Sequence, residues 1–192
     1  MGTFAAMSDP GHAEPVVSAT AEVVSVPPTG TTWPADIVNA SPRISDDGKV
    51  VVFDSMTGTD AATRRVMIST RPAPGVTTAV PDAPSAHPGV SGNGCVVAYS
   101  VPVVATNSVR LVALKLDRPG CAPAGPQATP VTIETIDNPG TEDGALPPPA
   151  LSFDGTKIVW STGTTVLRYV DSGTGFALPP DTIRPPLSRN FW

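Results

Sequence analysis

Residue types that commonly carry catalysis are scarce in this chain, which has only two histidines and two cysteines. His12 lies in an N-terminal stretch of small and polar residues, so a histidine-based triad or multi-histidine metal site is excluded unless other parts of the protein supply partners for His87. The serine hydrolase motif Gly-x-Ser-x-Gly fails at the last position of residues 89–93, which read Gly-Val-Ser-Gly-Asn. We therefore predict a non-enzymatic chain with no catalytic residue, metal or cofactor.

The acidic residues do not form a recognisable ion site. Asp46 and Asp47 belong to a turn, while Glu142 and Asp143 lack the ordered ligand spacing of a calcium loop. The formal net charge is −5 and the basic residues are scattered, which argues against nucleic acid as a partner. No apolar run approaches the roughly 18 residues of a membrane span.

The two cysteines, Cys95 and Cys121, are the remaining candidates for covalent chemistry. Cys95 precedes an apolar strand, and Cys121 lies in a loop rich in Pro and Gly, so a bridge would hold that loop against the strand. Loop entropy makes such a bridge worth roughly 3–4 kcal/mol. The alternative of two independent thiols remains open. A bridge would place the protein outside the cytoplasm, secreted or periplasmic, although residues 1–7 have no signal-peptide character.

A hairpin pattern occurs three times, at residues 42–53, 88–99 and 149–160. Each copy reads Pro, any residue, an aliphatic residue, Ser, any residue, Asp or Asn, Gly, and then a run ending in an aromatic residue. The aromatic residues are Phe53, Tyr99 and Trp160. Asx-Gly supplies the positive φ angles of a two-residue hairpin turn, and a leading Pro suits a strand start. The pattern therefore predicts three hairpins of common design.

The apolar runs 50–53 and 96–99 do not alternate with polar residues, so both faces of these strands should be buried. Sheets stacked radially bury both of their faces, whereas each sheet of a two-layer sandwich leaves its outer face exposed to solvent. The copies start 46 and 61 residues apart, and a spacing in the forties is typical of four-stranded propeller blades. Further strands are predicted at 65–70, 76–80, 109–116, 131–136, 164–170 and 175–178, and an N-terminal strand at 22–26.

The motif resembles the TolB-like (WD40-like) β-propeller repeat, Pro-x-aliphatic-Ser-x-Asp-Gly-x-x-aliphatic-x-aromatic, from about residue 21 to the C-terminus. The resemblance implies an all-β fold of about three four-stranded antiparallel blades with little or no helix, as part of a six-bladed ring. It also implies binding of a protein or small ligand at the channel mouth. Arg43 and His87 flank the Pro of the innermost strands and are the candidate channel residues.

The expected organisation is a disordered tail at 1–19 followed by a partial propeller at 20–192. Its repeats span about 40–84, 85–136 and 137–184, and a fourth begins at 185–192. Remaining blades or another subunit would then be needed to close the ring. Two other interpretations remain: the gating propeller of a prolyl-oligopeptidase-like hydrolase whose catalytic domain lies outside this chain, and a structural module of a larger surface protein.

Overall fold

The computed structural model describes residues 25–28, 30–71, 76–121, 129–137, 146–161, 165–172 and 175–178. The first sheet contains β1 (Ile37–Ile44), β2 (Val50–Thr57), β3 (Arg65–Thr70) and β4 (Val76–Ala79). The second contains β5 (Ala86–Val90), β6 (Val96–Val103), β7 (Ser108–Lys115) and β8 (Val131–Asp137). The third contains β9 (Ala150–Leu151), β10 (Lys157–Ser161), β11 (Val166–Asp171) and β12 (Phe176–Ala177). Single-turn 3-10 helices lie in two of the connections: η1 (Ala61–Thr63) between β2 and β3, and η2 (Val104–Thr106) between β6 and β7.

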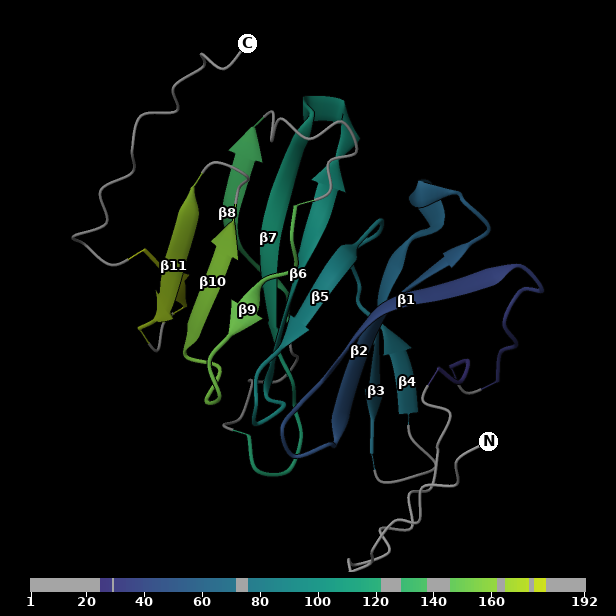
Figure 1. Ribbon diagram of the computed structural model, residues 1–192, viewed down its shortest axis with the longest axis horizontal. Coiled ribbons are helices and arrows are strands. Elements are labelled where there is room, and N and C mark those ends of the chain that lie inside the picture. The colour runs from purple at the N-terminus through teal and green to yellow at the C-terminus, as the bar shows by residue number, and fades with distance from the viewer. Residues whose placement is uncertain are drawn as a thin grey trace, which may run out of the picture.

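Each sheet is antiparallel with its strands in chain order, and the three sheets stand side by side as blades (Figure 1). Strand β5 contacts β1, β2 and β3 of the first blade and β9 of the third. Strand β5 therefore lies against both neighbouring blades. We call the first strand of each blade its inner strand. The predicted all-β class, with four strands per blade, is confirmed.

Two apolar cores fill the spaces between the blades. The first contains Val50, Val52, Val66, Ile68, Val80, Val97, Tyr99, Val101, Val112 and Leu114. The second contains Val96, Ala98, Val109, Leu111, Ala113, Leu146, Ile158, Trp160, Leu167 and Tyr169. Alternate residues of one strand enter different cores, because successive side chains point to opposite faces. We call these the preceding and following faces of a blade, after the neighbour in the chain that each one meets.

The central aromatic of every repeat lies on the preceding face. Tyr99 packs against the first blade and Trp160 against the second, while Phe53 packs with Val51, Met67 and the part-buried Trp33. The polar ends of two rings bind the segment between blades: the Tyr99 hydroxyl donates to Asp82 Oδ2 at 2.8 Å, and Trp160 Nε1 donates to the Pro147 carbonyl at 3.2 Å. The repeated aromatic thus both fills an interface and fixes the connection that crosses it.

The Ser and Asx residues of the repeat form the same hydrogen bonds in every copy. In the first, Ser45 Oγ donates to Asp47 Oδ1 at 2.6 Å, which also accepts from the Lys49 amide at 3.0 Å, while the Val50 amide donates to Ser45 Oγ at 3.0 Å. The corresponding distances are 2.8, 3.0 and 3.0 Å in the second copy and 2.6, 3.0 and 3.0 Å in the third. These bonds satisfy backbone groups that the hairpin leaves unpaired.

The predicted two-residue turn is wrong. Backbone bonding between Ser45 and Val50 encloses a four-residue loop, and the Gly48 amide donates to the Ser45 carbonyl at 2.9 Å. Within this loop only Gly48 has a positive φ, +67°. The mirror-image two-residue turn needs positive φ at two positions, whereas the Asx side chain supports a wider loop that needs one.

Neighbouring turns are joined to each other. The Asp46 amide donates to the Gly92 carbonyl at 2.8 Å, and the Asn93 amide donates to the Phe153 carbonyl, also at 2.8 Å. Gly92 occupies the variable position of the repeat that holds Asp46 and Phe153 in the other copies, and it lies between those two side chains: an added Cβ would stand 2.6 Å from Asp46 Oδ2. The turns therefore form one continuous end of the stack.

The predicted N-terminal strand at 22–26 is wrong where it can be examined, since Ser25 and Val26 are not in a strand. Residues 22–24 lie outside the described residues, as do the predicted tail at 1–19, Glu142, Asp143 and the predicted fourth repeat at 185–192.

Candidate functional site

The inner strands of the first two blades are bulged at equivalent positions. The pairing of β1 with β2 shifts between Ala40 and Arg43, and that of β5 with β6 shifts between Ala86 and Gly89. Each bulge holds a non-glycine residue of left-handed φ directly before the repeat Pro: Ser41 at +52° and His87 at +55°. Such a conformation costs an L-residue about 1–2 kcal/mol, and bulges and strained residues concentrate near functional sites.

Asp54 brings these two bulges together. The His87 amide donates to Asp54 Oδ1 at 3.1 Å and Oδ2 at 3.4 Å, and the Ser41 side chain helps to lower the pKa of this carboxylate. Asp54 follows the aromatic residue of the first repeat on β2, and its carboxylate accepts from the backbone of β5. Because Asp54 is 4% exposed, this link between the two blades lies inside their interface. We call Ser41, Asp54, Arg64 and His87 the inner-edge cluster.

Burial and Arg64 set the electrostatics of the inner-edge cluster. Burial raises the pKa of Asp54, opposed by Arg64, the His87 amide and Ser41. Burial, and then the positive charge of Arg64, lower the pKa of His87, which keeps its imidazole neutral at pH 7. Arg64 Nε is buried and has no hydrogen-bond partner within the described part of the chain. A guanidinium beside a neutral imidazole can bind a carboxylate or another polar acceptor.

The two predicted channel residues have different surroundings. His87 is half-buried in the inner-edge cluster. Arg43 is exposed on β1, where its Nη1 donates to the neighbouring Pro42 carbonyl at 3.0 Å, and no hydrogen bond joins it to His87. Sequence reasoning missed Asp54, although a signal existed: the residue after the repeat aromatic is Asp in the first copy and Ser100 or Ser161 in the others.

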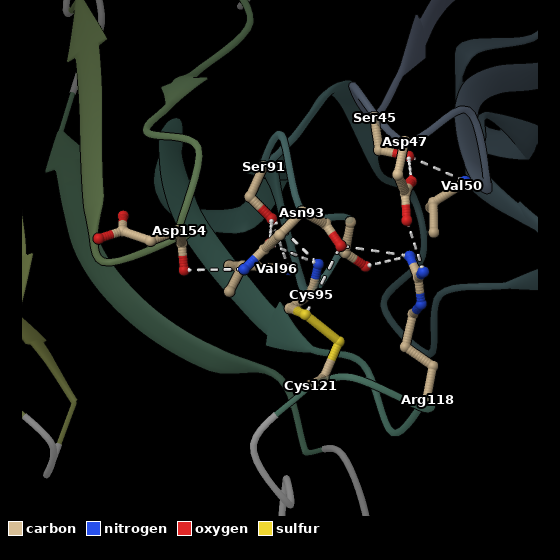
Figure 2. The surroundings of a disulfide bond; sticks show 11 residues. Ser45, Asp47, Val50, Ser91, Asn93, Cys95, Val96, Arg118, Cys121 and Asp154 are labelled. Atoms are coloured by element: carbon tan, nitrogen blue, oxygen red, sulfur yellow. Dashed lines mark hydrogen bonds and ion pairs between the residues drawn. A yellow bond between two sulfur atoms is a disulfide. The ribbon is translucent and has the colours of Figure 1, made fainter.

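The predicted bridge between Cys95 and Cys121 is confirmed (Figure 2). The Cys121 amide donates to the Arg118 carbonyl at 3.1 Å, closing a turn that contains Gly120 at φ +90°. The Leu116 amide donates to the Cys95 carbonyl at 2.8 Å. The loop after β7 is thus held at both ends against the start of β6.

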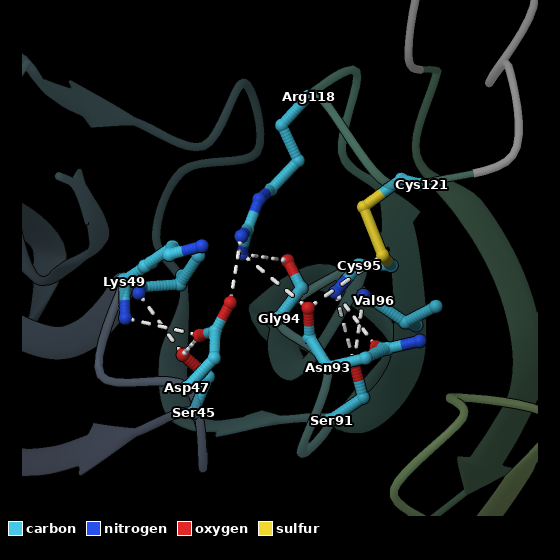
Figure 3. A network of polar contacts seen from close by, with 11 residues as sticks. Ser45, Asp47, Lys49, Ser91, Asn93, Gly94, Cys95, Val96, Arg118 and Cys121 are labelled. Carbon is cyan, nitrogen blue, oxygen red and sulfur yellow. Dashed lines mark hydrogen bonds and ion pairs between the residues drawn. A yellow bond between two sulfur atoms is a disulfide. The ribbon is translucent and has the colours of Figure 1, made fainter. Parts of the chain in front are cut away.

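This loop places Arg118 between the turns of the first two repeats (Figure 3). Arg118 Nη2 contacts Asp47 Oδ2 at 2.8 Å, while Nη1 donates to the carbonyls of Gly94 at 3.2 Å and Asn93 at 3.4 Å. The Ser45 hydroxyl is the main cause that lowers the pKa of Asp47, with further contributions from Arg118 and the Lys49 amide. Arg118 joins two blades at the turn end, as Asp54 does at the inner edge.

A groove of about 480 Å³ lies on the preceding face of the first blade. Its walls include Trp33, Pro34, Thr57, Thr63, Arg65 and Met67.

Among the described residues, no three His, Cys, Asp or Glu side chains gather so as to hold a metal ion. The same residues contain no helix that is long and apolar enough to cross a membrane.

No protein-family model and no curated protein matches the chain. The β-propeller domain of the Trilobed protease from Pyrococcus furiosus, which has an open velcro topology, is similar at a TM-score of 0.53 and 11% identity, covering 81% of this chain and 45% of that domain. TolB from Acinetobacter baumannii aligns at a TM-score of 0.29 and 13% identity, covering 74% of this chain and 44% of TolB. The chain spans less than half of either protein. The predicted β-propeller is confirmed at the level of its fold.

Proposed function

We propose that the chain is a non-enzymatic β-propeller module that binds a protein or small ligand at the inner edge of its blades. The inner-edge cluster carries this proposal. It combines two bulged strands, a fixed positive charge at Arg64 and a neutral imidazole at His87 on a rigid scaffold. Binding residues tend to occupy such irregular positions on rigid frames.

The ligand chemistry that this cluster fits is a carboxylate-bearing peptide or small molecule. Arg64 supplies planar N–H donors of permanent charge, which suit carboxylates. The Cys95–Cys121 bridge supports a location of the protein outside the cytoplasm, because disulfides persist in oxidising compartments.

The experiment is a selection of displayed random peptides on the immobilised chain, followed by anisotropy measurements with synthetic versions. Arg64→Ala should weaken the selected peptides about tenfold, as expected for loss of one charged hydrogen bond, and His87→Ala should also weaken them. Val104→Ala, at an 86% exposed position in η2, is the matched control and should leave affinity unchanged. Peptides that bind all variants equally would place the function elsewhere.

A second candidate is a propeller that belongs to a hydrolase. Its support is the presence of a protease's propeller domain among the similar structures, a likeness that shows the fold alone. The complete reading frame of the gene separates the candidates, because a neighbouring α/β catalytic domain would assign the blades to an enzyme.

A further inference from the structure

The preceding faces of the three blades carry equivalent apolar triads. Strand pairing aligns Val51, Phe53 and Met67 of the first blade with Val97, Tyr99 and Val112 of the second and with Ile158, Trp160 and Leu167 of the third. In the second and third blades the preceding blade covers this triad, so its residues are at most 5% exposed. No blade precedes the first sheet within the described residues.

The triad of the first blade is nevertheless buried: Val51, Phe53 and Met67 are 5%, 3% and 3% exposed. The residue packed against them is Trp33. Its indole is fixed by a hydrogen bond of 2.8 Å from Nε1 to the Ser25 carbonyl. Within the described part of the chain, one aromatic side chain thus contributes apolar cover on a face that the other blades bury against a neighbouring sheet.

Residues 25–28 and 30–36, which we call the strap, hold Trp33 in this place. The Thr31 amide donates to the Pro28 carbonyl at 3.0 Å, forming a turn with Gly30 at φ +82°. At the other end, the Gly58 amide donates to the Asp36 carbonyl at 2.8 Å. The strap is therefore anchored to the first blade by backbone bonding as well as by the indole.

The opposite end of the stack gives an independent observation. The following-face positions of Val50 and Val96 hold Lys157 in the third blade, and the positions of Ile68 and Ala113 hold Arg168. Lys157 and Arg168 are both exposed. Two cations replace the aliphatic residues that form the cores between blades, and burying them unpaired would be costly. Both outer faces therefore differ from the faces between blades.

We propose that the strap takes the place of a preceding blade: it closes the first blade within the same chain, so this face can receive another blade only after the strap is displaced. The expectation that further blades or a second subunit close the ring through the first blade is then replaced by an open stack of blades. Displacing Trp33 would create an apolar association surface, because exposed patches of this kind attract partners.

The test compares the wild-type chain with Trp33→Ala by light scattering after gel filtration and by the fluorescence of an apolar dye. The wild type should be monomeric and should not increase the fluorescence of the dye. Trp33→Ala should bind dye and associate, while Thr32→Ala, an exposed strap residue, should behave as the wild type. A Trp33→Ala chain that is folded and monomeric and does not increase the dye fluorescence would overturn the proposal. A wild type that associates through this face would also overturn it.

Methionine oxidation in the unaltered protein keeps the proposal testable if Trp33→Ala does not fold. Peroxide should oxidise Met67 several times more slowly than the less buried Met56 in a monomeric sample, because the strap shields Met67. Equal rates for the two methionines, measured by mass spectrometry, would show that the strap does not cover the first blade.

Discussion

Substitution of Arg118 tests whether the Cys95–Cys121 disulfide positions this residue between the turns of the first two repeats. The bridge joins cysteines 26 residues apart, and loop entropy alone assigns it about 3.5 kcal/mol. Arg118→Ala removes one ion pair and two longer bonds to carbonyls. Since the side chains of Arg118 and Asp47 are 14% and 31% exposed, solvent screening limits the loss to about 1–2 kcal/mol.

The two effects should not add. If the bridge holds Arg118 between the turns, then Arg118→Ala costs less in a Cys95→Ser, Cys121→Ser background than in the bridged protein. A double-mutant cycle in urea, followed by tryptophan fluorescence, should give a coupling energy of about 1 kcal/mol. Arg43→Ala is the matched control, because this exposed arginine bonds only its neighbour's carbonyl within the described residues. Strict additivity of the two changes would refute a positioning role for the bridge.

Three further outcomes follow from the same contacts. Hydrogen bonds, first from the Ser152 hydroxyl, lower the pKa of Asp154 to about 2, so its contribution to stability is complete above about pH 4 and lost as the pH falls towards 2. Asp154→Asn should flatten this part of the urea midpoint against pH, and an unchanged slope would contradict it. His87→Gly should exceed His87→Ala in stability by about 1 kcal/mol, because only Gly relieves the left-handed φ; equal stabilities would show no strain. Tyr99→Phe should cost about 1–2 kcal/mol in thermal unfolding through the lost bond to Asp82, and a loss near zero would count against that bond.

The strands were predictable because their signal repeats. The predicted strand at 65–70 coincides with β3, and the aromatic positions lie on equivalent faces. An apolar run with no alternation correctly indicated burial on both faces of β2 and β6. The turn was not predictable at the same level, because Asx-Gly fits both a two-residue turn and a four-residue loop. The Ser Oγ bonds decide between them, and they depend on side-chain geometry.

The candidate site was less predictable, because its residues come from different blades. His87 was found through its place beside the repeat Pro, whereas Arg64 belongs to no repeated position and is brought near Asp54 by the loop containing η1. Trp33 likewise gives no pattern in the sequence. Its role follows from the packing of a segment without regular structure against β2 and β3, which local periodicity does not encode.

The choice between Asp and Asn in the repeat shows how tertiary contacts select among residues that the turn itself accepts equally. Oδ1 makes the same bonds within the turn in both cases. The other terminal atom faces the next blade: Asp47 Oδ2 meets the guanidinium of Arg118, whereas Asn93 Nδ2 donates to the Asp154 carbonyl at 3.3 Å. A carboxylate suits the first neighbour because it is a cation, and an amide suits the second because it is an acceptor. The repeat sequence therefore specifies the hairpin, and the residue at the Asx position matches the neighbour that each of these two turns meets.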